Sequence, residues 1–63
     1  MMHSLTVEQV TVIARALRQA RADQLDGDIF TRQLTHDLME RFPGLTACEA
    51  MDRIAYVRQQ LSF

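Results

Sequence analysis

The sequence has few of the residues that build disulfide-rich, membrane-spanning or phosphate-loop proteins. Its 63 residues include one cysteine, two glycines, one proline and no tryptophan. One cysteine excludes an internal disulfide, and a lone thiol is typical of a reducing compartment. No apolar run reaches the roughly 18 residues that span a membrane, and the start Met1-Met2-His3-Ser4 lacks the basic region of a secretory signal. We therefore expect a cytoplasmic protein with no membrane partner.

Lysine is absent as well, so arginine supplies all seven basic residues against eight acidic ones, for a net charge of −1. This balance lacks the basic footprint of nucleic-acid-binding domains. The composition, 48% apolar and 24% charged, is typical of one folded domain, here residues 1–63. A chain of this length buries only about 60% of its unfolded surface, which leaves a marginal core. We therefore expect a homodimer.

Apolar residues recur at helical spacing in three segments, approximately 6–25, 29–42 and 46–61. The expected stripes are Val7, Val10, Ile13, Ala14, Leu17, Ala20 and Leu25; then Phe30, Leu34, Leu38 and Phe42; then Ala47, Ala50, Ile54, Val57 and Leu61, with Met51 at the edge. No segment alternates with the period of two that marks a strand. The sequence predicts an all-α fold, either a small three-helix bundle or a helix-turn-helix-like arrangement.

The first helix is expected to begin with a capping box formed by Thr6 and Gln9. Its end is expected at Asp26-Gly27-Asp28. Gly27 can take the left-handed conformation that closes a helix, and Asp28 can cap the next one.

The second turn carries stronger signals. Phe42-Pro43-Gly44 stops the second helix, because the residue before proline avoids helical geometry and glycine tolerates the exit. Thr46 and Glu49 form a full capping box for the third helix, and the preceding Leu45 can staple onto Ala50.

No residue pattern indicates catalysis, a cofactor or a metal. His36 and Glu40 share a helix face, but two ligands do not close a metal site. The Asp26-Gly27-Asp28 turn lacks the spaced oxygens of a calcium loop. Cys48 lies in the first turn of the third helix, and we expect a half-buried structural residue there. We expect neither an enzyme nor a cofactor.

The charges are unevenly distributed along the chain. Arg15, Arg18 and Arg21 step along the first helix, whereas the stretch from Asp26 to Gly44 is net negative. The first helix of one subunit can therefore face the second helix of another, acid to base. The plain alternative is that both are solvated faces.

Several large apolar side chains fall outside the three stripes, and together they favour association. They are Val12, Ile29, Met39, Tyr56 and Phe63. Tyr56 has an apolar body and a polar tip that suit an interface, and Arg53 and Gln60 can supply a hydrogen-bonding rim. The expected partner-binding residues are Tyr56, Arg53, Gln60, Arg15, Arg18, Ile29 and Met39.

The sequence favours a small regulatory or adaptor protein that binds another protein and has no chemistry of its own. The alternative is a dimeric DNA-binding regulator that uses the second and third helices or the arginines of the first. The exposed acids Glu49 and Asp52 at the start of the third helix oppose phosphate there, so nucleic acid is the less favoured partner. A structural accessory subunit is a third possibility.

Overall fold

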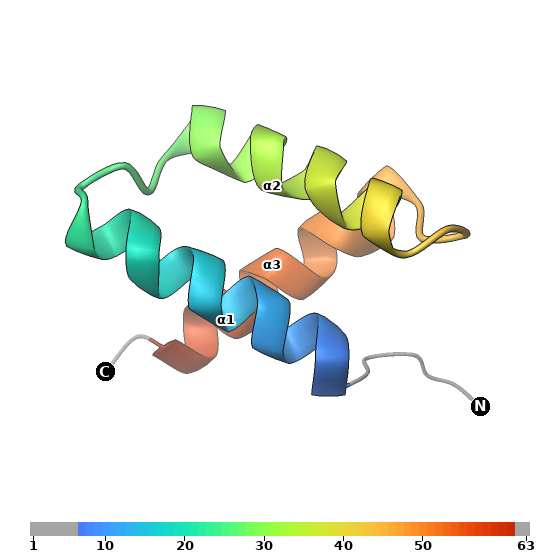
Figure 1. The fold of residues 1–63 in the computed structure, drawn as a ribbon, viewed down its shortest axis with the longest axis horizontal. Helices are drawn as coiled ribbons and strands as arrows, with labels where there is room; N and C mark the ends of the chain where they lie inside the picture. The colour runs from blue at the N-terminus through green and yellow to red at the C-terminus, as the bar shows by residue number, and fades with distance from the viewer. Residues whose placement is uncertain (1–6, 62–63) are drawn as a thin grey trace.

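The computed structural model describes residues 7–61, which form three helices and two short turns. The helices are α1 (Val7–Ala22), α2 (Asp28–Arg41) and α3 (Ala47–Leu61). In Figure 1, α3 crosses behind α1 and α2. It packs against both of them, whereas the contact between α1 and α2 is the smallest of the three. The expected all-α class with three helices is confirmed, and residues 7–61 contain no strand.

One small hydrophobic core lies where the three helices meet. Its buried apolar residues are Ile13, Leu17 and Ala20 of α1, Leu34 and Leu38 of α2, and Ala50, Ile54 and Val57 of α3. Each set follows the spacing of three, four or seven residues that places side chains on one helix face. All of them belong to the stripes that the sequence predicts.

The edges of the predicted α1 stripe are wrong. Val7 is 84% exposed and Leu25 is 65% exposed, because the buried row of α1 is narrow and runs through Gln9, Ile13, Leu17 and Ala20. Val12, expected on the outside, is instead half-buried and packs against the core. It lines a groove with Leu34, so α2 covers this flank of α1.

The end of α1 also differs from the prediction. The helix ends at Ala22, and Gln24 takes the left-handed conformation with φ 59°. The Leu25 N–H donates to the Ala20 carbonyl at 2.7 Å, and the Gln24 N–H donates to the Arg21 carbonyl at 3.1 Å. These two bonds form a Schellman motif, whose left-handed residue follows the last helical residues directly. The motif therefore falls at Gln24, and Gly27 is too far along the chain to serve it.

Gly27 instead precedes α2, where its backbone is extended (φ −172°, ψ −165°). No side chain caps this helix start. Asp28, expected to be the cap, is the first residue of the helix, where its carboxylate faces the positive end of the helix dipole. The prediction of an Asp28 cap is therefore wrong by one position.

The second turn matches its prediction. Gly44 has φ +97°, and the Leu45 N–H donates to the Phe42 carbonyl at 3.0 Å. A proline second and a positive-φ glycine third are the signature of a type II turn. The Thr46–Glu49 capping box is present, and half-buried Leu45 packs against the core cluster that contains Ala50. Thr6, predicted to cap the first helix, and Phe63, predicted to be exposed, lie outside the described residues.

Candidate functional site

The candidate site is a groove of about 500 Å³ along the seam between α2 and α3. We call it the α2–α3 groove. Its lining residues are Asp28, Thr31, Arg32, Thr35, His36 and Met39 of α2, with Ala47 and Met51 of α3. The two methionines are its largest apolar side chains, 38% and 54% exposed.

Helical spacing explains why these residues share the groove. Asp28, Thr35 and Met39 recur seven and four residues apart on α2, beside the buried pair Leu34 and Leu38. On α3, Ala47 and Met51 are four residues apart and flank the buried Ala50. The groove is therefore the exposed margin of the α2–α3 core contact.

The buried polar side chain in the groove, Thr35, has its hydrogen-bond partner within α2. Thr35 is buried, and its hydroxyl donates to the Thr31 carbonyl at 2.8 Å. This bond stays within α2, so it satisfies the hydroxyl without a partner from outside. Methionine is flexible and polarisable, and it is frequent at surfaces that adapt to different ligands.

The rim of the groove is charged on one side. Arg32 and His36 are exposed on α2, and Asp28 is exposed at the start of the same helix. The lining residues from α3 carry no charge. Within residues 7–61 Arg32 makes no ion pair, so its guanidinium can take an external carboxylate.

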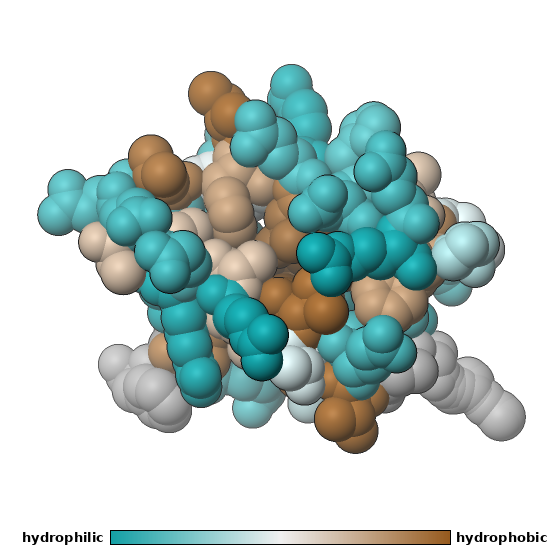
Figure 2. Space-filling view, in the orientation of Figure 1, coloured by the Kyte–Doolittle hydropathy of each residue, from teal (hydrophilic) through white to brown (hydrophobic). Residues whose placement is uncertain are grey.

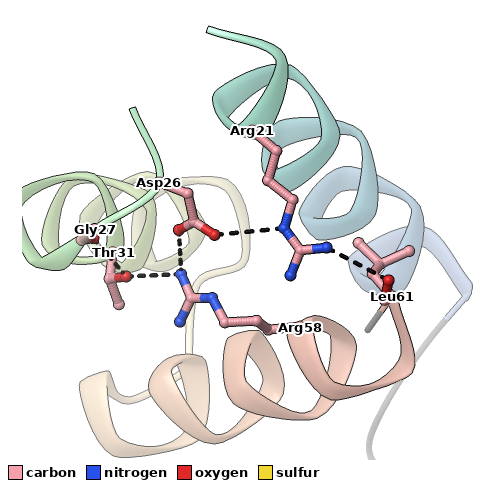
Figure 3. A network of polar contacts seen from close by, with 6 residues as sticks. All are labelled: Arg21, Asp26, Gly27, Thr31, Arg58 and Leu61. Carbon is pink, nitrogen blue, oxygen red and sulfur yellow. Dashed lines mark hydrogen bonds and ion pairs between the residues drawn. The ribbon is translucent and has the colours of Figure 1, made fainter. Parts of the chain in front are cut away.

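A separate polar network joins all three helices at the other end of α3 (Figure 3). Arg58 donates to an Asp26 carboxylate oxygen at 2.7 Å and to the Thr31 hydroxyl at 2.9 Å. The Nε atom of Arg21 lies 3.6 Å from the other carboxylate oxygen, and its Nη1 donates to the Leu61 carbonyl at 3.4 Å. With its side chain only 18% exposed, Asp26 ties the α1–α2 turn to α3. The network is structural, because internal partners engage its carboxylate and both arginines.

The Thr46–Glu49 capping box is the other ordered polar cluster. The Thr46 N–H donates to the Glu49 carboxylate at 3.0 Å, and the Glu49 N–H donates to the Thr46 hydroxyl at 3.1 Å. The pKa of Glu49 is lowered, first by the Thr46 backbone N–H, then by the Thr46 hydroxyl, and also by the charge of Arg53. Glu49 is therefore an anion at neutral pH at the start of α3.

The structure spreads the expected partner-binding residues over three surfaces. Met39 lies in the α2–α3 groove, while Arg15 and Arg18 are exposed on α1 and Ile29 is exposed at the start of α2. The third group shares a flank of α3 at spacings of three and four and is made up of Arg53, Tyr56 and Gln60. Arg53 is half-buried, Gln60 is exposed and Tyr56 is 47% exposed.

The sequence prediction missed Arg32, Thr35, Ala47 and Met51 as residues of one site. In the sequence, Met51 lies at the edge of the apolar stripe of the third helix and Met39 lies outside that of the second. Whether the two side chains come together depends on how α2 and α3 pack. The two methionines could have indicated a shared site, because each lies next to a core position and their helices follow one another along the chain.

Nothing in the described residues assembles into a metal centre. Across residues 7–61, no three side chains of His, Cys, Asp or Glu come together in a group that could hold a metal ion. His36 and Glu40 are both exposed. Cys48 is exposed rather than half-buried as expected, because it points away from the buried row of Ala50, Ile54 and Val57.

Over the same range, no helix is both long and apolar enough to cross a bilayer. Comparisons of the chain with protein families, with curated proteins and with solved structures find no match. The groove, its methionines and its charged rim therefore carry the functional argument.

Proposed function

We propose that the chain is a small regulatory or adaptor protein that binds a helix of another protein in the α2–α3 groove, without catalysis. The observation that carries this proposal is the exposure of Met39 and Met51 side by side in a groove whose rim carries Arg32 near its middle and Asp28 at one end. Binding there would occlude or bridge the partner.

The dimensions of the groove suit a short helix. Its α2 wall runs from Asp28 to Met39, about 16 Å at 1.5 Å per residue, which is about three helical turns. An amphipathic helix laid in such a groove buries side chains at spacings of three, four and seven residues. Mobile methionine side chains can adjust to those anchors.

The rim specifies the charge of the partner. Arg32 borders the groove on α2, with His36 beside it as a hydrogen-bonding side chain, so acidic residues beside the apolar stripe of the partner helix are favoured. Asp28 borders the far end and favours a basic residue there. The expected partner is therefore an amphipathic helix with an acidic flank, and the charges also set its direction.

Two designed helical peptides test the proposal. Both carry the same leucine stripe, and one is flanked by glutamate and the other by lysine. Fluorescence anisotropy should show at least about tenfold tighter binding of the glutamate peptide. Met51→Glu should abolish this binding, and Arg32→Glu should reverse the preference between the peptides.

Val7→Glu is the control, because Val7 is an apolar residue of α1 that is even more exposed than Met51 and lies outside the groove lining. It should bind the glutamate peptide as the wild type does. Equal binding by the wild type and the Met51→Glu variant would refute the groove as the site, as would failure of both peptides to bind.

DNA binding is the alternative function, and the same protein tests it. Glu49 is anionic and Asp52 is exposed in the first turns of α3, where a recognition helix meets phosphates. We expect affinity for random duplex DNA no better than the micromolar range at about 150 mM salt. Sub-micromolar binding that weakens with added salt would favour the DNA-binding regulator.

A further inference from the structure

A second surface, which shares only Asp28 with the lining of the α2–α3 groove, combines apolar and acidic residues at the α1–α2 turn. Leu25 is 65% exposed and Ile29 is 76% exposed, and both line a hollow with half-buried Phe30. Asp28 lines the same hollow, and Asp23 is the first residue after α1, where its carboxylate accepts a hydrogen bond from Gln19 at 3.0 Å. Figure 2 shows hydrophobic side chains standing out at the upper left, over this turn and the start of α2. We call this surface the turn patch.

The outer face of α1 has the opposite charge. Arg15 and Arg18 line a shallow hollow of about 500 Å³ with half-buried Val10 and Ala14. Neither arginine makes an ion pair within residues 7–61, unlike Arg21, which binds Asp26. We call this surface the arginine face.

The order of charges makes the two surfaces complementary between copies. Along the chain, the two arginines at positions 15 and 18 precede the two aspartates at positions 23 and 28. When two such segments run antiparallel, the arginines of each lie opposite the aspartates of the other. A two-fold axis makes both pairings at once, as in an isologous dimer.

A small residue allows the two helices to approach. Ala22 is exposed at the end of α1 and lies seven and four residues after Arg15 and Arg18, so it shares their helix face. A crossing near Ala22 brings the α1 helices close without displacing a large side chain. With the helices crossed at this point, the arginine face of each copy would lie over the turn patch of the other.

We infer that a second copy of this chain binds here, with the arginine face of each copy seated on the turn patch of the other. The contact covers the two most exposed large apolar side chains of the turn patch, Leu25 and Ile29. It leaves the α2–α3 groove open except at Asp28, the one residue that lines both surfaces, so the rest of the groove stays accessible to a partner.

Charge exchange tests the inference. One double variant carries Arg15→Glu and Arg18→Glu, and the other carries Asp23→Arg and Asp28→Arg. Sedimentation velocity should show a concentration-dependent dimer for the wild type. Either variant alone should bind itself at least about tenfold more weakly, because both halves of its interface repel.

The equimolar mixture of the two variants should form a heterodimer, because both halves of the mixed interface then attract. The chain that carries all four changes should dimerise with itself again. Circular dichroism of each variant checks that the helices form, and the mixture reports on the interface even if one variant is destabilised alone.

Three results would overturn the inference. They are a wild type that stays monomeric over about a hundredfold concentration range, a double variant that dimerises as the wild type does, and a mixture that fails to associate. Met51→Glu is the control for the other surface, and it should leave the dimer unchanged. Loss of the dimer in that variant would place the second copy in the α2–α3 groove.

Discussion

The two turns of the molecule join helices of similar length but are held in different ways. In the α2–α3 turn, residues 42–46, each hydrogen bond that closes the turn or caps α3 joins residues three or four apart. In the α1–α2 turn, residues 23–27, Asp26 is held by Arg58, 32 residues further along the chain. The α2–α3 turn is specified by its own sequence, whereas the α1–α2 turn has, beside its local Schellman motif, a contact that depends on the packed fold.

This difference separates two kinds of stabilisation. A local cap forms together with its helix and needs no other element. The Asp26–Arg58 contact requires α3 to be docked, so it adds stability only after the loop-closure entropy has been lost. We therefore expect changes at the two turns to affect stability through different interactions.

The largest effect is expected from Asp26→Ala, which removes the centre of the long-range network. Arg58 and Arg21 lose their carboxylate partner, and each arginine side chain is about one third exposed. Hydrogen bonds to charged groups contribute about 1.5–3 kcal/mol, and solvent screening favours the lower end, so we expect a loss of about 1.5 kcal/mol. Urea denaturation measures it.

Asp52→Ala is the control for this prediction, because Asp52 is exposed and makes no hydrogen bond or ion pair within the described residues. It should change the unfolding free energy by less than about 0.5 kcal/mol. The Asp26→Ala loss should shrink at high salt. Equal effects of the two substitutions would show that the network adds nothing to stability.

In the α2–α3 turn, the substitution that corresponds to Asp26→Ala is Thr46→Ala. It removes the hydroxyl that accepts from the Glu49 N–H at 3.1 Å, and loss of such a cap costs about 1 kcal/mol. The loss should depend on salt less than that of Asp26→Ala, because the hydroxyl also donates to the Glu49 carboxylate at 3.2 Å but no pair of opposite charges is broken. An unchanged denaturation midpoint would mean that the third helix does not depend on this cap.

Substituting serine for each of the two glycines should change the stability in opposite directions. Gly44 has φ +97°, so Gly44→Ser strains the backbone and should cost about 1 kcal/mol. Gly27 is extended and has no atom within 4 Å of an added Cβ, so serine fits there. Gly27→Ser supplies the missing cap of α2 and should add about 0.5 kcal/mol. Thermal denaturation of both variants tests the pair, and a shift of the same sign in both would contradict it.

The same contrast explains what the sequence could predict. The third helix and its start were readable because Pro43, Gly44, Thr46 and Glu49 act on neighbours within a few residues. The end of α1 was misplaced because a Schellman motif accepts a non-glycine residue when its hydrogen bonds are good. Gln24 occupies that position, and no pattern of residue types marked it.

The candidate site was predictable only in pieces. Helical spacing identifies the core rows, so Met39 and Met51 could each be placed beside a row. Their meeting depends on the rotation of α2 against α3, which the packing of Leu38 and Ile54 determines. The Asp26–Arg58 pair was invisible for the same reason, since no local rule connects residues 32 positions apart.

The smallest expected effect concerns the charge of Glu49 in the local cap. Hydrogen bonds from Thr46 and the charge of Arg53 lower the pKa of this carboxyl in the folded state. A lowered folded pKa means that the ionised form stabilises the fold above the unfolded pKa, which is about 4.3 for glutamate. That contribution is lost as the pH falls through the lowered pKa, where both states become protonated. Glu49→Gln keeps the capping geometry but removes the charge, so it should be slightly less stable than the wild type at pH 7 and equal to it near pH 2. Denaturation at the two pH values tests this, and a difference that persists at the lower pH would assign the effect to geometry instead of charge.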